Sequence, residues 1–275
     1  MNPIDALFGR LRSEGRKAFI PFLTAGDPSI AATVQVARSL PARGASLLEV
    51  GFPYSDPIAD GPVIQASYTR ALDRGVRLDD VFACARGIAG APEYDGGRVP
   101  VVGMVSYSLV HRRGAERFLD QALAAGLSGA IVPDLPLEES TTLARLAAAR
   151  DFKLVQLVTP TTPRERARQI AALSTGFVYC VSVAGITGER DRLPVELLEQ
   201  LAWLRKQTDL PLCVGFGVSR PEHVRMLRDV ADGVIVGSAL VRLLEGAEGD
   251  KLPQAAGAVG SLVASLSAAL NPPAA

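Results

Sequence analysis

Short apolar stretches alternate with helix-forming stretches along nearly the whole of the 275-residue sequence. In stretches such as Ala130-Ile131-Val132 and Val234-Ile235-Val236, every consecutive residue is hydrophobic. Such runs are typical of parallel strands that are buried on both faces. We expect strands at residues 19–24, 46–50, 100–105, 129–133, 153–158, 177–182, 211–215 and 233–236. Eight strands, each followed by a helix within roughly 250 residues, predict an α/β fold of the (β/α)₈ TIM barrel type.

An amphipathic helix is predicted ahead of the first strand, at residues 4–14, because apolar residues recur there at helical spacing. We expect this helix to plug one end of the barrel. Further helices are expected at residues 30–43, 63–74, 79–88, 114–125, 138–150, 163–173, 194–207, 220–229, 238–245 and 253–269. This series includes extra short helices in the loops after the second and eighth strands. Residues 1–270 are therefore expected to form a single barrel domain, and residues 271–275 a disordered tail.

The alternative fold is a doubly wound open sheet. Such a sheet would require a glycine-rich fingerprint directly after the first strand. The residues found there, Ala25-Gly26-Asp27-Pro28, do not have that pattern. The barrel is therefore the predicted fold.

Charge and composition exclude several classes of protein. The 29 Lys and Arg residues balance 29 Asp and Glu residues. With no net positive charge, the sequence does not indicate binding to nucleic acid or to an anionic membrane, although binding of small anionic substrates remains possible. Residues 1–5 lack a signal-peptide pattern, and no apolar stretch approaches the roughly 20 residues of a membrane span. We expect a cytoplasmic protein. Cys84, Cys180 and Cys213 are too scattered for a disulfide framework or a zinc site, and we expect reduced core cysteines.

A carboxylate, Glu49, stands at the end of the second apolar stretch. A buried glutamate must either have its charge stabilised by a partner or keep its proton through a raised pKa. The prolines and glycines of residues 51–62 restrict the loop that follows, so Asp56 and Asp60 are held on a stiff backbone. Carboxylates at one strand end predict acid/base chemistry. The alternative is that Glu49 pairs with an arginine and that the aspartates only cap turns.

Glycine-rich stretches follow the sixth, seventh and eighth strands. They are Gly185-Ile186-Thr187-Gly188, Gly215-Phe216-Gly217 and Gly237-Ser238. Backbone N–H groups in such loops, and at the start of a helix, bind phosphate, and barrels often hold phosphate after strands seven and eight. The alternative is that these glycines only permit tight turns. We expect a phosphate site with Gly188, Gly217, Gly237 and Ser238.

The residues that are missing from the strand ends narrow the chemistry. No lysine is placed for a Schiff base, and the two histidines, His111 and His223, are too isolated for a metal site. If the reaction is carbon–carbon chemistry, carboxylates alone must drive it, and the substrate must supply its own electron sink. Phe22, Tyr179 and Phe216 offer an apolar aromatic pocket for such a group.

The sequence resembles the tryptophan synthase alpha subunits over nearly its whole length. The motifs stand in the order of that family: residues 19–28 (FIPFLTAGDP), 49–62 (EVGFPYSDPIADGP), 185–188 (GITG), 215–218 (GFGV) and 237–238 (GS). The resemblance implies a lyase that splits indole-3-glycerol phosphate into indole and glyceraldehyde 3-phosphate. It also implies that Glu49 is the general acid/base, that Asp60 contacts the indole N–H and that the glycine loops hold the phosphate.

The same resemblance implies a partner. The chain would work with a pyridoxal-phosphate-dependent beta subunit in an α2β2 heterotetramer, while needing no cofactor of its own. We expect the loops at residues 53–58 and 107–111 to face that subunit. Asp56 would transmit binding of the beta subunit to the catalytic carboxylates, and Tyr107 would lie in the second loop. The alternative is that Asp56 only caps the turn before Pro57.

Two positions depart from the family pattern. Tyr107 is followed by Ser108-Leu109-Val110 where the family usually has an asparagine close behind the tyrosine. Val183 stands where some relatives have an arginine, so closure of the loop after the sixth strand is expected to depend on Thr187 and the backbone. Two other functions also remain: a free-standing lyase that releases indole, and a subunit without catalytic activity that only activates its partner.

Overall fold

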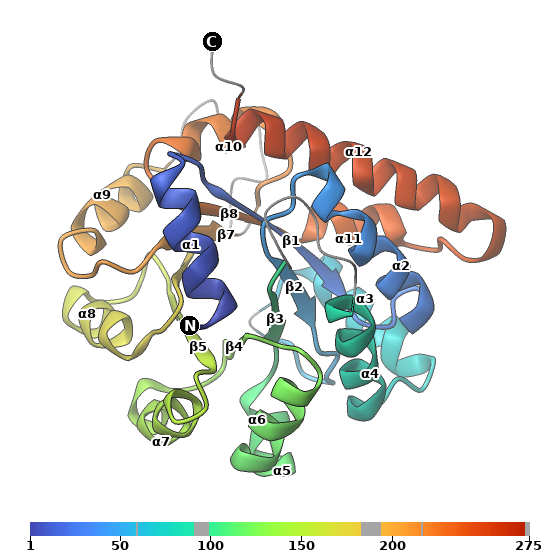
Figure 1. The fold of residues 1–275 in the computed structure, drawn as a ribbon, viewed down its shortest axis with the longest axis horizontal. Coiled ribbons are helices and arrows are strands. Elements are labelled where there is room, and N and C mark those ends of the chain that lie inside the picture. The colour runs from blue at the N-terminus through green and yellow to red at the C-terminus, as the bar shows by residue number, and fades with distance from the viewer. Residues whose placement is uncertain (59, 91–98, 183–193, 216, 273–275) are drawn as a thin grey trace.

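A closed barrel of parallel strands forms the centre of the molecule, as the computed structural model shows (Figure 1). The structure describes residues 1–58, 60–90, 99–182, 194–215 and 217–272. Neighbouring strands pair in chain order, and β8 closes on β1. The strands are β1 (Ala18–Thr24), β2 (Leu48–Gly51), β3 (Val101–Met104), β4 (Gly129–Ile131), β5 (Lys153–Val158), β6 (Val178–Val181), β7 (Leu212–Gly215) and β8 (Gly233–Val236). The predicted (β/α)₈ fold is confirmed.

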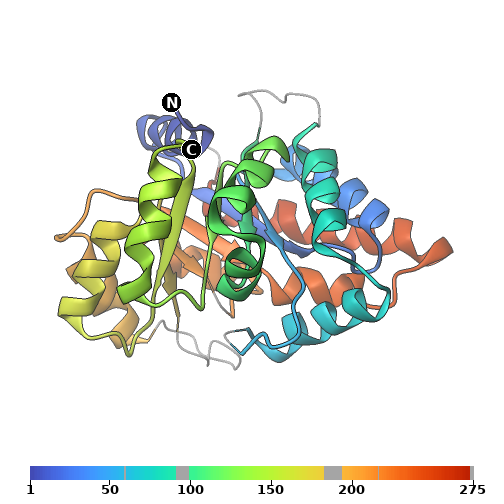
Figure 2. The same ribbon diagram turned by 90° about the horizontal axis from the view of Figure 1, so that it is seen from below.

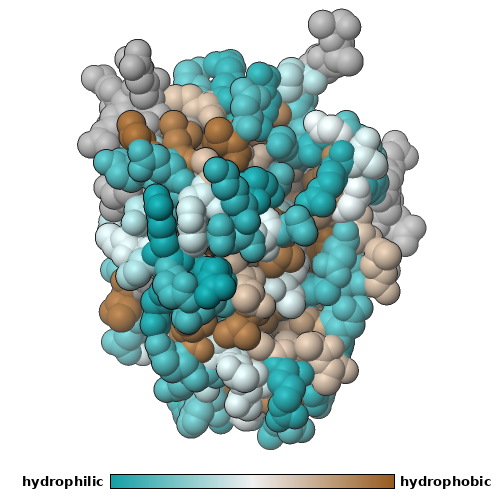
Figure 3. All heavy atoms as spheres, turned by 90° about the vertical axis from the view of Figure 1, so that its left-hand side faces the viewer, coloured by the Kyte–Doolittle hydropathy of each residue, from teal (hydrophilic) through white to brown (hydrophobic). Residues whose placement is uncertain are grey.

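Helices surround the barrel and cover the outer face of its strands (Figures 1 and 2). The helices of the described chain are α1 (Pro3–Ser13), which closes one end of the barrel, α2 (Ile30–Ser39), α3 (Pro62–Asp73), α4 (Leu78–Ala89), α5 (Tyr107–Arg113), α6 (Ala115–Ala124), α7 (Leu137–Ala148), α8 (Arg164–Leu173), α9 (Val195–Leu204), α10 (Pro221–Arg228), α11 (Ser238–Leu244) and α12 (Leu252–Leu270), with 3₁₀ turns at Pro41–Arg43 and Gly249–Lys251. On the side shown in Figure 3, hydrophilic residues predominate over the outer surface and hydrophobic ones lie between them.

Two elements differ from the sequence prediction. The helix expected at residues 30–43 ends at Ser39, and a separate 3₁₀ turn follows from Pro41, because proline has no N–H to continue the helix. Helix α5 was expected to be loop. Its first turn is held by side chains: the Ser106 hydroxyl accepts from the Ser108 N–H at 3.1 Å, and Asp134 accepts from the Tyr107 N–H at 2.7 Å. The loop after β3 therefore contains an extra helix, like the loops after β2 and β8.

Side chains from alternate strand positions fill the barrel. Ile20 and Phe22 of β1 and Val102 and Met104 of β3 belong to one buried cluster, as expected where successive side chains point to opposite faces. The intervening positions pack against the helices in a second cluster. Glu49 of β2 is aligned with Phe22 in the β1–β2 register. The catalytic candidate thus lies in the interior of the barrel.

Helix α1 closes the end of the barrel where the strands begin, as predicted. Its buried side chains, Ile4, Leu7, Phe8 and Leu11, belong to the interior cluster. Asn2 caps the helix and its Nδ2 donates to the carbonyl oxygen of Ser128 at 2.9 Å, just before β4. The opposite end of the barrel, at the carboxyl ends of the strands, is not covered by α1 and holds the candidate active site.

The sequence analysis expected no apolar stretch long enough to span a membrane, and this expectation was wrong. Among the described residues, the segment Gly249–Leu270 is long and apolar enough to do so. The core helix of a soluble protein passes the same test. Within the fold, α12 packs against α10 and α11 (Figure 1) and buries one side, which includes Val259, Val263 and Leu266. This one-sided burial is typical of an amphipathic helix on the surface of a globular domain.

Candidate active site

Glu49 is the most deeply buried carboxylate of the site, with 1% of its surface exposed. Its Oε2 atom has no hydrogen-bond partner among the described residues. Burial, and to a smaller extent the charge of Asp60, raise the pKa of Glu49 from 4.5 to about 8. No described arginine pairs with it, so the alternative interpretation of a structural ion pair is wrong for the described part of the chain. Glu49 is therefore protonated at neutral pH.

Asp60 lies in the short loop between β2 and α3. Helix α3 holds this loop, because the Gln65 side chain donates to the carbonyl oxygens of Asp60 at 2.7 Å and Pro57 at 3.2 Å. Burial is the largest cause that raises the pKa of Asp60, to about 6, and the charge of Asp134 also raises it. The Tyr54 hydroxyl opposes this increase. The Tyr54 hydroxyl group and Asp60 do not form a hydrogen bond of ordinary geometry, since neither the Tyr54 hydroxyl oxygen nor Asp60 Oδ2 has a hydrogen-bond partner among the described residues. The effect of Tyr54 on the pKa of Asp60 therefore comes from its proximity.

A cavity of about 190 Å³ at the carboxyl ends of the strands brings the predicted residues together. Its described lining consists of Phe22, Glu49, Asp60, Ile64, Met104, Tyr179, Gly217, Val218, Ser219, Ile235, Gly237, Ser238, Ala239 and Arg242. The carboxylates, two of the predicted aromatic residues and part of the glycine cradle thus share one space. Three predicted site residues, Thr187, Gly188 and Phe216, lie outside the described residues. No lysine or histidine is among the described lining residues.

The glycines near the cavity have two different structural roles. Gly217 has a φ of 79°, which L side chains rarely adopt, and Gly237 lies just before α11. Gly215, by contrast, makes room for an aromatic ring, because a Cβ atom there would collide with the Tyr179 side chain. Gly51 does the same for Phe22. Turn and packing needs therefore explain some of the glycines that the sequence analysis grouped with phosphate binding.

Several residues of the site were missed by the sequence analysis. Tyr54 and Tyr68 lie with their ring centroids 5.6 Å apart, and both hydroxyl groups are buried without a hydrogen-bond partner among the described residues. Asp134 contributes its charge from the end of β4, and Arg242 lines the cavity from α11. The signal for Asp134 was its place after a strand. Nothing in the sequence marked Tyr68 or Arg242, because only the fold brings α3 and α11 to the mouth of the barrel.

The two predicted partner loops lie on the same side of the molecule as the cavity, after β2 and β3. The Asp56 carboxylate is exposed and accepts from the Ser55 hydroxyl at 2.7 Å. Ile58 in the same loop is 87% exposed. Tyr107, at the start of α5, is partly buried and packs edge-on to His111 at 6.0 Å between ring centroids. Ile58 is thus a large hydrophobic side chain that is left exposed in the loop leading to Asp60.

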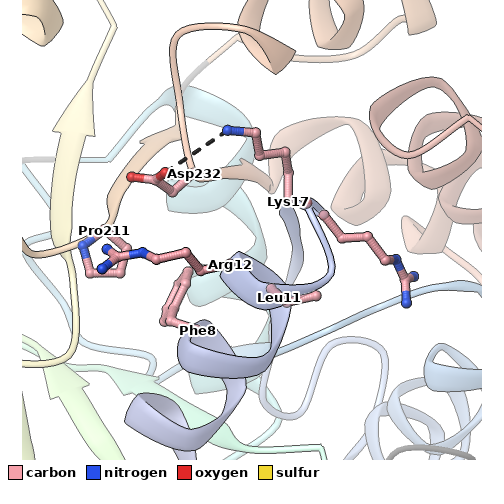
Figure 4. Close-up of a pocket in the computed structure, with 8 residues that line it drawn as sticks. Phe8, Leu11, Arg12, Lys17, Pro211 and Asp232 are labelled. Carbon is pink, nitrogen blue, oxygen red and sulfur yellow. Dashed lines mark ion pairs between the residues drawn. The ribbon is translucent and has the colours of Figure 1, made fainter.

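A second, smaller pocket of about 130 Å³ lies at the other end of the barrel (Figure 4). It is lined by residues that include Phe8 and Leu11 of α1, and Lys17 reaches toward Asp232 across it, with 3.9 Å between Lys17 Nζ and Asp232 Oδ1. None of the predicted site residues lines this pocket. The cavity at the carboxyl ends of the strands is therefore the candidate active site, in keeping with other barrels.

Comparisons with known proteins agree with this geometry. Residues 8–269 match the family model described as tryptophan synthase alpha chain. The tryptophan synthase alpha chain of Rhodopirellula baltica is 53% identical over 242 residues, covering 88% of this chain and 86% of that protein. That of a Cyanothece species is 45% identical over 273 residues, covering 99% of both.

Solved structures give the same result. The crystal structure of tryptophan synthase subunit alpha from Legionella pneumophila is 35% identical and superposes with a TM-score of 0.87, covering 98% of this chain and 99% of that one. A chain in the aminoacrylate-bound tryptophan synthase of M. tuberculosis is 30% identical with a TM-score of 0.84, covering 98% of this chain and all of that one. With matches that extend over nearly its full length in sequence and in fold, this chain belongs to the tryptophan synthase alpha chain family.

Proposed function

We propose that Glu49 and Asp60 cleave indole-3-glycerol phosphate into indole and glyceraldehyde 3-phosphate in the cavity at the carboxyl ends of the strands. The observation that carries this proposal is the pair of carboxylates that line one cavity, each with a buried oxygen atom that no described group hydrogen-bonds. Their pKa values, about 8 for Glu49 and about 6 for Asp60, differ. Between these values Glu49 is an acid and Asp60 is an anion.

The first step uses the proton of Glu49. Glu49 donates this proton to C3 of the indole ring, which turns the ring into a cationic indoleninium. The ionised Asp60 stabilises the positive charge near the indole N–H. A partly buried anion is more effective in this role than one in water, because its surroundings screen charges less.

The second step returns the proton. Glu49, now a carboxylate, accepts the proton of the glycerol hydroxyl on the carbon next to the ring. The carbon–carbon bond breaks, its electrons return to the indole ring and the oxygen becomes the carbonyl oxygen of glyceraldehyde 3-phosphate. Glu49 ends protonated, as it began, so one residue acts as acid and then as base. The indole ring itself is the electron sink.

Substrate binding follows from the lining of the cavity. Phe22 and Tyr179 line it with aromatic surface for the indole ring, and Gly217, Gly237 and Ser238 offer backbone N–H groups and a hydroxyl for the phosphate. We further assign Gly188 to phosphate binding, and Thr187 and Phe216 to substrate binding. The roles of Thr187, Gly188 and Phe216 are predicted from the sequence, since these residues lie outside the described part of the chain.

The chain is further proposed to act as the alpha half of a complex with a beta subunit that carries pyridoxal phosphate, as an α2β2 heterotetramer. The exposed Ile58 and Asp56 support this proposal, because they occupy one stiff loop that leads directly to Asp60. A stiff loop loses little entropy on docking. We place the assembly in the cytoplasm and treat residues 1–270 as one catalytic domain. Asn271, which was expected to begin a disordered tail, is instead tied to the Lys17 backbone by hydrogen bonds of 2.8 and 3.0 Å.

A turnover assay tests the reaction. The purified chain is incubated with indole-3-glycerol phosphate, alone and with a beta subunit, and indole formation is measured for the parent and for Glu49→Gln. We expect the parent to release indole and the variant to lose roughly 10²- to 10⁴-fold in rate, the range of a general acid/base. An inactive parent would favour a subunit that only activates its partner. A parent that neither binds nor responds to the beta subunit would favour a free-standing lyase.

A further inference from the structure

Arg242 is the cationic side chain among the described residues that line the catalytic cavity. The other charged groups of that lining are the carboxylates of Glu49 and Asp60. A phosphate ester brings up to two more negative charges into the same space. Backbone N–H groups alone would have to balance them, and α11, which begins at the cavity, is only seven residues long. A helix this short has few aligned peptide dipoles to offer an anion.

The position of Arg242 on α11 directs it toward Ser238. The two residues are four positions apart, so they lie on the same face of the helix, and both line the cavity. Long helical side chains point back toward the helix N-terminus. This direction is toward the turn that carries Ser238 and Gly237, which line the same cavity.

The guanidinium group of Arg242 is unpaired within the part of the chain that the structure describes. Within the described residues it makes no hydrogen bond or ion pair, although carboxylates lie close in the sequence. Nearby Glu245 is engaged by Arg70, with 3.1 Å between Nη1 and Oε1, and Glu248 is engaged by Arg74. Arg70 in turn holds buried Asp27 through two hydrogen bonds of 3.1 and 2.6 Å. The acidic groups around the end of α11 thus have other partners, and Arg242 remains available.

From these observations we propose that Arg242 binds the phosphate group of the substrate and makes the site specific for a phosphorylated glycerol side chain. This proposal rests on the proposed function and deepens it. Arg242 acts on binding rather than on proton transfer, since it lines the cavity from α11 and the two carboxylates come from β2 and its loop. Its guanidinium fork suits phosphate oxygens, which it can bind through two hydrogen bonds.

The test compares Arg242→Met and Arg242→Lys with the parent. Arg242→Met should raise KM for indole-3-glycerol phosphate roughly tenfold, the scale of one hydrogen bond to a charged group, with kcat changed less than about twofold. Arg242→Lys keeps the charge and should recover part of the loss. The matched control is Arg117→Gln on α6, which removes the same charge from an exposed position outside the cavity. A change in KM no larger than that of this control would overturn the proposal.

A substrate without the phosphate separates a binding role from a structural one. Removing the phosphate should lower kcat/KM strongly for the parent and less for Arg242→Met, because the variant has already lost that contact. Equal losses in both proteins would show that Arg242 does not meet the phosphate. Calorimetric titration with glyceraldehyde 3-phosphate gives a readout that does not depend on turnover. If the parent cleaves nothing but Arg242→Met still binds this ligand more weakly, the proposed reaction fails and the role of Arg242 stands.

Discussion

The charge of Asp60, in the loop after β2, adds to burial in raising the pKa of Glu49 within that strand. The two side chains line the same cavity, yet each has a different environment. Glu49 lies within the barrel, whereas Asp60 is only partly buried and has the Tyr54 hydroxyl nearby. This difference sets the order in which the two groups lose their protons, and the order assigns their roles.

The first prediction concerns the pH dependence of catalysis. Because the active form has Asp60 ionised and Glu49 protonated, kcat/KM should follow a bell with limbs near pH 6 and pH 8. In Asp60→Asn the alkaline limb should move to lower pH, since the charge that raises the pKa of Glu49 is gone. The acid limb should also disappear. An acid limb that survives in this variant would belong to the substrate phosphate, whose second pKa is about 6, and would contradict the assignment to Asp60.

The second prediction concerns stability. Glu49 has an ordinary pKa of 4.5 and a folded-state pKa of about 8, so between these values the folded chain binds a proton that the unfolded chain has released. Stability contributed by the neutral carboxyl group is therefore complete below pH 4.5 and is lost as the pH rises to about 8. Glu49→Gln removes this loss. The difference in the free energy of unfolding between Glu49→Gln and the parent should therefore increase in favour of the variant by up to about 1.4 kcal/mol per pH unit between pH 6 and 8.

Denaturant titrations at several pH values measure this gain. The window starts at pH 6 because the contribution of Asp60 to the pH dependence of stability lies mainly between its ordinary pKa of 3.8 and its folded-state pKa of about 6. Glu139→Gln, at an exposed position in the first turn of α7, is the matched control. We expect the control to follow the slope of the parent. If the free energy of unfolding of Glu49→Gln has the same pH dependence as that of the parent, Glu49 is ionised in the folded chain.

The third prediction tests the phosphate cradle. Gly237→Val adds a branched side chain at the entrance to α11, where a Cβ atom would already lie 3.4 Å from Phe22 Cδ1. KM for the substrate should rise far more than kcat falls, because the added methyl groups occupy the space of a phosphate oxygen. Gly257→Val in α12, where a Cβ atom meets nothing within 4 Å, controls for the substitution itself. Unchanged binding of glyceraldehyde 3-phosphate by Gly237→Val would place the cradle elsewhere.

The fourth prediction concerns the partner loop. Ile58→Asp should weaken binding of a beta subunit, since it replaces an 87% exposed hydrophobic side chain with a charged one in the loop that leads to Asp60. Asp56→Ala should leave binding largely intact but reduce the stimulation of cleavage, a coupling worth about 1–3 kcal/mol in typical systems. Sedimentation and turnover assays with the beta subunit distinguish the two effects. Equal stimulation of Asp56→Ala and the parent would leave Asp56 as a turn residue only.

The sequence was sufficient to predict the barrel and the main catalytic candidate. Parallel strands that are buried on both faces must be apolar at every position, so the strand pattern is local and periodic and can be recognised without the fold. Glu49 was recognisable because a carboxylate within such a run is costly to bury. Helix α5 was not predicted, because its N-terminus depends on Asp134 from the end of another strand.

Only the tertiary structure decided how the site is assembled. The pKa order of Glu49 and Asp60 depends on burial and on the distance between groups from different elements, and neither quantity is written in local sequence. Closure of β8 on β1 brings α11 beside α3, which places Arg242 in the same cavity as Asp60 although 182 positions separate them in the numbering (242 − 60). Local patterns determine elements because they reflect backbone periodicity. The chemistry of the site depends on long-range packing, which sets which charges share one poorly screened space.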